Sequence, residues 1–227
     1  MQIFIYIKLF LLLYKKIILH SIDIMKSKKS KNLLHTTKFN LTSFIYENPI
    51  DRFFYYSIEY ISDTVFNLNI TPNMITFVGF ISALLSAYFL YEKKIIYCII
   101  FWLISYYLDL LDGYIAKKYN QGSVFGGWFD HISDIIKLIV YLYVLYIHKK
   151  FNVIYIIIIL TILGLSNTAC RTKFLKKDTD KKDSLYLVQK MCPDKNYVKY
   201  TRYWGEGTIG LIIPVIILYY YKNEMEF

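Results

Sequence analysis

The sequence predicts an all-α protein: a polytopic membrane bundle of five to six transmembrane helices, preceded by an amphipathic helix. Hydrophobic residues make up 56% of the 227 residues. Several apolar runs approach the roughly 20 residues that a spanning helix needs. No long hydrophilic block indicates a second domain. We therefore expect one membrane domain over residues 48–227 and an N-terminal extension over residues 1–47.

The N-terminal extension is expected to be poorly ordered or to form an extra anchor. Its apolar run, residues 3–19, is interrupted by Lys8, Lys15 and Lys16. No basic stretch precedes the run and no small-residue cleavage site follows it, which argues against a signal peptide. Met25 offers an alternative start, so residues 1–24 need not belong to the functional fold.

Residues 48–66 predict the amphipathic helix. Pro49 suits the first turn of a helix, where its missing N–H is not needed. The segment has a broad apolar face, but charged residues such as Asp51, Arg52 and Glu59 make it too charged to cross a membrane. We expect it to lie in the membrane interface. The alternative is an ordinary amphipathic helix packed on the protein.

Five spans are predicted from the apolar runs, at residues 74–91, 95–111, 129–147, 152–169 and 207–221. The linkers 92–94 and 148–150 then share one side of the membrane. The N-terminal tail, the segment between the second and third spans, and residues 170–204 share the other. Because Lys and Arg are concentrated on that second side, the positive-inside rule places it in the cytosol. The expected location is an endoplasmic-reticulum-like or plasma membrane.

The formal net charge of +10 does not indicate nucleic-acid binding, since the basic residues cluster beside apolar runs, as topology-setting charges do. Cys98, Cys170 and Cys192 share no C-x-x-C spacing, so neither a zinc site nor a disulfide framework is expected. Cys98 lies inside an apolar run, which indicates a small core residue.

Four aspartates at the ends of two apolar runs are the main functional signal. Asp109 and Asp112 are three residues apart, a turn of roughly 300° that leaves them on adjoining parts of one helix face. Asp130 and Asp134 are four apart and share a face of the next helix. Two antiparallel helices joined by a short turn bring these faces together. Because repulsion would otherwise protonate some of the carboxylates, we expect hard divalent cations there.

Small and basic residues between the aspartates suit a phosphate ligand. Gly113 and Gly126 carry no Cβ, so a ligand can approach the backbone closely. Ala116 is small and lies one turn after Asp112, and Lys117 adds positive charge. Together with Mg²⁺, these are the parts of a nucleoside-diphosphate site.

The motif resembles the signature of the CDP-alcohol phosphatidyltransferase family, D-x2-D-G-x2-A-R-x8-G-x3-D-x3-D. The positions in register are Asp109, Asp112, Gly113, Ala116, Gly126, Asp130 and Asp134. The segment TPNMIT, residues 71–76, is similar to the PN-x-(I/L)-T entry of these enzymes, so the resemblance covers about residues 48–221. The compact size and NQGSVFG, residues 120–126, resemble the phosphatidylinositol-synthase-like branch.

The resemblance implies an enzyme that displaces CMP from a CDP-linked substrate with an alcohol. Asp109, Asp112 and Asp130 would hold one or two ions of Mg²⁺ or Mn²⁺, with two implied by the resemblance, and Asp134 would complete the site and act as general base. The CDP pocket would be lined by Gly113, Ala116, Lys117 and Gly126, with Asn73 and Thr76 approaching from the first span. Membrane lipids are implied partners, and similar proteins are homodimers.

Two departures from the family pattern stand out. Lys117 replaces the family's arginine, which keeps the charge but loses the planar fork for two hydrogen bonds to phosphate. Five spans are found where the family has six, so an inactive member is one alternative.

The donor is expected to be CDP-diacylglycerol. The alternative is a CDP-choline or CDP-ethanolamine:diacylglycerol phosphotransferase, because FDHISD at 129–134 resembles the FDH-x2-D of that branch. A divalent-cation transporter is the alternative from another class, although an ion pathway would need acidic residues through the depth of the membrane.

His131 is expected to point roughly 100° away from Asp130 and to pack or contact a headgroup.

Basic residues after the fourth span are candidates for the acceptor site. Arg171, Lys173 and Arg202 either bind the phosphate of an acceptor or lipid, or only set the topology. Glu206 either touches the acceptor alcohol or is an interfacial residue without a ligand.

Overall fold

The computed structural model of the chain describes residues 47–175 and 188–224. The predictions for the apolar run at 3–19, for Met25 and for the rest of the N-terminal extension before Glu47 lie outside these residues. The helices are α4 (Pro49–Asn67), α5 (Pro72–Tyr91), α6 (Ile95–Lys118), α7 (Val124–Ile147), α8 (Phe151–Leu175), η1 (Val188–Met191), η2 (Lys195–Tyr197), α9 (Val198–Thr201), η3 (Arg202–Trp204) and α10 (Glu206–Tyr221). The described residues contain no strand, so the all-α prediction is confirmed.

Local capping explains where the helices near the aspartates begin. The Asn48 side chain accepts a hydrogen bond from the Ile50 N–H at 2.9 Å, and Pro49 follows it as expected. Thr71 caps α5 ahead of Pro72, and Ser123 caps α7 by accepting from the Gly126 N–H at 2.9 Å. Each cap satisfies a backbone donor that has no partner within its helix.

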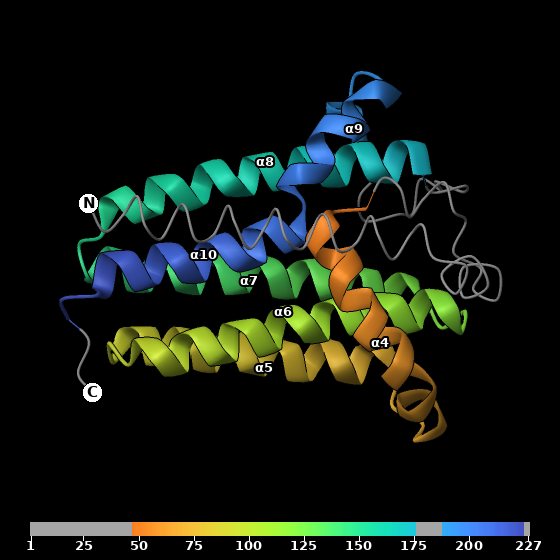
Figure 1. The fold of residues 1–227 in the computed structure, drawn as a ribbon, viewed down its shortest axis with the longest axis horizontal. Helices are drawn as coiled ribbons and strands as arrows, with labels where there is room; N and C mark the ends of the chain where they lie inside the picture. The colour runs from red at the N-terminus through yellow and green to blue at the C-terminus, as the bar shows by residue number, and fades with distance from the viewer. Residues whose placement is uncertain (1–46, 176–187, 225–227) are drawn as a thin grey trace.

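The long helices α5, α6, α7, α8 and α10 run alongside one another, and α4 crosses one end of the bundle (Figure 1). The turns at 92–94 and 148–150 and the end of α10 lie together at the other end. The α6–α7 turn lies at the α4 end, where Asn120 adopts φ 55°, a left-handed conformation that asparagine tolerates. The two ends of the bundle therefore carry the linkers that the sequence assigned to opposite sides.

Four helical stretches are long and apolar enough to cross a membrane: Pro72–Tyr91, Ile95–Lys118, Phe151–Phe174 and Val198–Tyr221. Helix α7 is as long as α6, at 24 residues, but is not among them. Helix α7 carries three charged residues, Asp130, Asp134 and Lys137, which lower its apolar character. The prediction of a polytopic helical membrane bundle is confirmed.

The bundle has two apolar cores. The larger one lies toward the linker end and includes Leu90, Cys98, Leu145 and Ile217, which confirms Cys98 as a buried, free thiol. The second core packs α4 on α6 and includes the fully buried Ile58. Helix α4 thus packs one face on the protein while Tyr60 stays exposed on the other.

The cysteine prediction was wrong. Cys170 at the end of α8 forms a disulfide with Cys192 after η1, with Cα atoms 5.0 Å apart and 22 residues between them in sequence. Both residues are buried in a small cluster with Ala169 and Val198. No short motif signals this pair, because the two cysteines meet only when the segment after α8 folds back onto that helix.

Candidate active site

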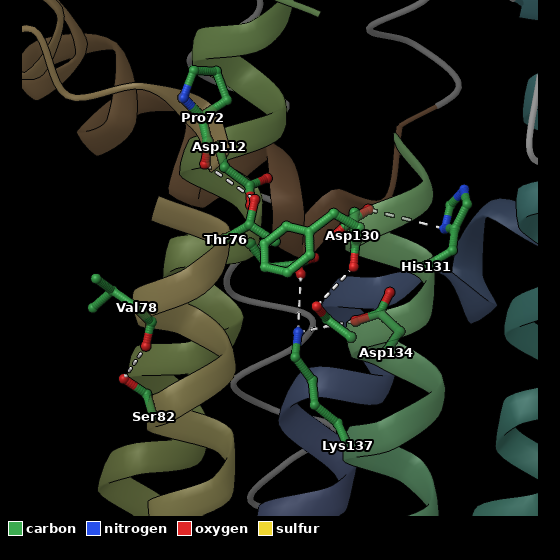
Figure 2. A network of polar contacts seen from close by, with 12 residues as sticks. Pro72, Thr76, Val78, Ser82, Asp112, Asp130, His131, Asp134 and Lys137 are labelled. Atoms are coloured by element: carbon green, nitrogen blue, oxygen red, sulfur yellow. Dashed lines mark hydrogen bonds and ion pairs between the residues drawn. The ribbon is translucent and has the colours of Figure 1, made fainter. Parts of the chain in front are cut away.

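The four predicted aspartates meet between α6 and α7, and Figure 2 labels Asp112, Asp130 and Asp134 among them. Carboxylate oxygens of Asp109, Asp112 and Asp130 all lie within 4.8 Å of one another. Asp134 belongs to a second group of the same dimension, with Asp130 and His131. The structure therefore brings the two helix faces together as the spacing predicts, with Asp130 common to both groups.

These groups fit a divalent cation chemically. One oxygen of Asp130, Oδ1, is buried and has no hydrogen-bond partner among the described residues. An unpartnered buried carboxylate oxygen costs free energy unless a cation or donor approaches it. The oxygen donors match the ligands of Mg²⁺ and Mn²⁺ better than those of zinc.

Thr76 links α5 to the aspartates. Its hydroxyl lies 2.5 Å from Oδ2 of Asp112 and 3.1 Å from the carbonyl of Pro72. Both Thr76 and Asp112 are buried, so this hydrogen bond fixes the carboxylate where water cannot replace it. The predicted approach of Thr76 to the site is therefore found as a direct contact with a carboxylate.

Lys137 is a site residue that the sequence reasoning missed. Its ammonium group lies 2.9 Å from Oδ1 of Asp134 and 3.5 Å from Oδ1 of Asp109, so it joins α6 and α7 between the two carboxylates (Figure 2). It follows Asp134 by three residues, which places both on one helix face. The three-residue spacing from Asp134 was the feature of the sequence that could have identified Lys137 as a site residue. The positive charge partly offsets the repulsion among the aspartates.

His131 lies nearer to the carboxylates than its helical position suggests. Its Nδ1 is 4.0 Å from Oδ2 of Asp130 (Figure 2). Adjacent helical residues project roughly 100° apart, yet these two side chains end 4.0 Å from each other. His131 can therefore contribute a nitrogen ligand as well as pack.

The predicted nucleotide-binding residues lie on α6 and α7, which carry the aspartates, and at the start of α5. A Cβ on Gly126 would lie 2.7 Å from Oδ1 of Asn73, so the glycine lets the starts of α5 and α7 approach closely. A Cβ on Gly113 would meet nothing within 4 Å, so that glycine faces open space. Ala116 is half-buried and Lys117 is exposed on the last turns of α6.

A buried polar junction lies beside the aspartates, where α4, α8 and α10 meet. Arg171 pairs with Glu47, at 2.5 Å between Nη2 and Oε2, and Tyr106 donates to Oδ1 of Asp51 at 2.7 Å. The Asn48 amide donates to the hydroxyl of Thr208 and the carbonyl of Arg202, both at 2.8 Å. These contacts hold α4 on the bundle next to the site.

The basic candidates for an acceptor site do not gather around one ligand position. Arg171 is engaged with Glu47, and Lys173 donates to the Cys192 carbonyl at 2.6 Å. Arg202 donates to the hydroxyl of Tyr203 at 2.6 Å. Glu206 is exposed and lines a cavity together with Asp109 and Asp134.

Two curated relatives match part of the chain. An archaetidylinositol phosphate synthase of Pyrococcus horikoshii is 38% identical over 77 residues, 34% of this chain and 41% of that protein. A CDP-diacylglycerol--inositol 3-phosphatidyltransferase of Candida albicans is 41% identical over 78 residues, 33% of this chain and 34% of that protein. The chain thus spans less than half the length of these relatives. No solved structure matches it.

The family described as CDP-alcohol phosphatidyltransferase matches residues 69–193, which is more than half of the chain. The matched range begins just before α5 and includes all four aspartates, Lys137 and both cysteines of the disulfide. The chain belongs to the CDP-alcohol phosphatidyltransferase family.

Proposed function

We propose that the protein is an integral-membrane phosphotransferase of phospholipid biosynthesis. It attacks the diphosphate of a CDP-linked substrate, CDP-diacylglycerol, with an alcohol hydroxyl and releases CMP. The observation that carries this proposal is the meeting of four signature aspartates from α6 and α7 within one site. Retention of all four argues against an inactive family member.

Asp109, Asp112 and Asp130 would hold Mg²⁺ or Mn²⁺, two ions by family resemblance, and Asp134 would complete the set. When bound, the metal neutralises phosphate oxygens and stabilises the departing CMP. Thr76 orients Asp112, and Lys137 supplies fixed positive charge between Asp109 and Asp134. The protein thus holds its carboxylates in place before substrate arrives.

Asp134 is the proposed general base. Its side chain is half exposed, unlike buried Asp112, and it lines the cavity that adjoins the site. It would take the proton from the acceptor hydroxyl as the alcohol oxygen bonds to the phosphorus that carries the lipid. The bond from that phosphorus to CMP breaks, and CMP leaves with the electron pair.

The pocket for cytidine diphosphate would lie between the starts of α5 and α7 and the end of α6. Gly113 leaves open space above the aspartates, and the close contact of Gly126 with Asn73 shapes the opposite wall. Ala116 is small enough to admit the ligand. Lys117 is exposed at the rim and would contact the nucleotide or its phosphates.

The names of the relatives support the choice of donor and suggest an acceptor. The Candida albicans protein is named for CDP-diacylglycerol and inositol, and the Pyrococcus horikoshii protein for archaetidylinositol phosphate. We therefore propose inositol or inositol phosphate as the first acceptors to test. CDP-choline and CDP-ethanolamine with diacylglycerol are the alternative pairs.

We also propose that the aspartates face the cytosol, because the basic segments flank that end of the bundle. The disulfide lies at the same end, and disulfides are rare in a reducing cytosol. Burial of both sulfur-bearing residues would slow reduction there. Thiol-reactive labelling of a cysteine introduced at exposed Gly122, from either side of sealed vesicles, decides the orientation.

The homodimer that the family resemblance implies is tested by the mass of the purified protein in nanodiscs.

The activity is tested with purified protein in lipid and each donor and acceptor pair, with Mg²⁺ or Mn²⁺. CMP release should require metal and one donor class. Asp134→Asn should abolish turnover while sparing CDP-diacylglycerol binding, whereas Asp63→Asn, on the exposed part of α4, should leave turnover unchanged. Metal flux without CMP release would replace the enzyme proposal with a transporter.

Lys117→Arg tests the departure from the family signature. Arginine restores the planar fork, so substrate affinity should rise through a second hydrogen bond to phosphate. The measurement is KM for the CDP-linked substrate. A fall in activity in this variant would contradict the assigned contact.

A further inference from the structure

A cavity of about 400 Å³ lies inside the bundle next to the candidate site. Its walls come from α6, α7, α8 and α10, with Ala83 of α5. Asp109, Asp134, Lys137 and Glu206 line one part of it, so it is continuous with the proposed reaction centre. Its size falls within the range of small-molecule pockets.

Most of the cavity wall is apolar. Leu138, Ile157, Ile209 and Ile213 line it beyond the charged residues. The two threonine hydroxyls in the wall use their donors within α8: Thr161 donates to the Ile157 carbonyl at 2.9 Å and Thr168 to the Gly164 carbonyl at 3.2 Å. A polyol placed there would lose its hydrogen bonds with water without replacement, whereas hydrocarbon would lose none.

The floor of the cavity is fixed by aromatic side chains whose polar atoms are already bonded. The Tyr141 hydroxyl contacts the Ser86 hydroxyl, and the Trp102 indole donates to the Gly210 carbonyl at 2.8 Å. The two rings also pack edge to face with centroids 4.9 Å apart. Tyr141 follows Asp134 by seven residues, so the cavity is about 10 Å deep along α7.

The cavity also has an apolar side opening. Ile135 of α7 and Leu165 of α8 line it and are nevertheless 57% and 42% exposed. Helices α7 and α8 lie close at their connecting turn and farther apart toward the α4 end (Figure 1). In a membrane, this opening would meet lipid chains rather than water.

We propose that this cavity binds the first part of one acyl chain of the lipid substrate, and that a chain longer than the cavity leaves it through the side opening. This deepens the proposed function, because a chain anchored there holds the phosphate of the lipid beside Asp134 and Lys137. A chain that crosses one leaflet is about 15 Å long, half of the hydrocarbon core. A cavity about 10 Å deep therefore takes only part of a long chain, and the remainder leaves by the side opening.

Photolabelling of the wild-type protein tests the site without requiring turnover. CDP-diacylglycerol and phosphatidic acid, each with a diazirine at the end of one acyl chain, are compared at 8, 12 and 16 carbons. The short chain should label Tyr141, Ile213 or their neighbours on the cavity floor. The long chain should label the opening near Ile135 and Leu165. Labels confined to outward residues such as Phe77 at every length would overturn the proposal.

A filled cavity provides the second test. Thr161→Phe places a ring inside the cavity, whereas Ile159→Phe, two residues away on the same helix, changes an exposed residue. Thr161→Phe should cut floor labelling and long-chain binding about tenfold, a typical cost of overpacking, while Ile159→Phe changes neither. Equal labelling in both variants contradicts the proposal. Absence of CMP release alongside normal floor labelling would refute the proposed reaction but support the acyl site.

Discussion

The hydroxyl of Thr76 lies 2.5 Å from Oδ2 of Asp112, and so joins the start of α5 to an aspartate of the family signature. Both side chains are buried, and the contact spans 36 residues of sequence. A buried carboxylate is oriented most firmly by a donor that water cannot displace. This hydrogen bond therefore makes α5 part of the proposed metal site although it contributes no aspartate.

Thr76→Val removes this donor at nearly constant volume. A hydrogen bond to a charged group contributes about 1.5–3 kcal/mol, so activity should fall roughly 10- to 100-fold. Metal titration of CMP release is the measurement, and the metal requirement should rise. Thr76→Ser keeps the hydroxyl and serves as the control. Equal activity of the valine variant would show that Asp112 needs no positioning from α5.

The two signature glycines should respond differently to alanine. On Gly113 the added methyl group faces open space, so stability should hold while KM for the CDP-linked substrate rises, if the ligand occupies that space. On Gly126 the methyl group would lie 2.7 Å from Oδ1 of Asn73, so α5 and α7 must shift. The melting temperature and KM, measured together, separate the two. An unchanged KM in Gly113→Ala places the nucleotide elsewhere.

Asp51 should make stability depend on pH. Burial, followed by the charge of Glu206, raises the pKa of Asp51 from 3.8 to about 8 in the folded protein. Because the folded state then binds the proton more tightly than the unfolded state, stability is highest below pH 3.8 and falls as the pH rises toward 8.

Asp51→Asn should remove that component, since the amide oxygen can still accept from Tyr106 and does not ionise in this range. Thermal unfolding between pH 5 and pH 9 in detergent is the measurement. The variant should show a flatter profile and greater stability than wild type at pH 8 and above, conditions chosen around the pKa in the folded protein. Parallel profiles for the two proteins would mean that Asp51 is ionised in the native state.

The disulfide should stabilise the segment that follows α8. It closes a loop with a sequence separation of 22, for which loss of the bond costs about 3 kcal/mol by chain entropy. Cys170→Ala and Cys192→Ala should each lower the melting temperature. The double variant should lose little more than either single variant, because both remove the same bond. Additive losses would show that the two thiols are not joined.

Much of the fold followed from local patterns in the sequence. Apolar runs of membrane length predict helices, and Pro49 and Thr71 mark helix starts through caps that involve only neighbouring residues. The pairing of Asp109 with Asp112 and of Asp130 with Asp134 follows from helical periodicity. These features were predictable because each depends on residues within about one turn of each other.

The remaining features of the site depend on how helices rotate and pack against one another. Lys137 reaches Asp109 on another helix, and Cys170 finds Cys192 only after the chain folds back. Asp51 becomes buried because α4 packs against α6 and α10. Sequence by itself determined the helices, the four aspartates and the family. Tertiary structure decided the partners of those aspartates and the cavity behind them, because side-chain contacts between distant segments arise only from interhelical packing.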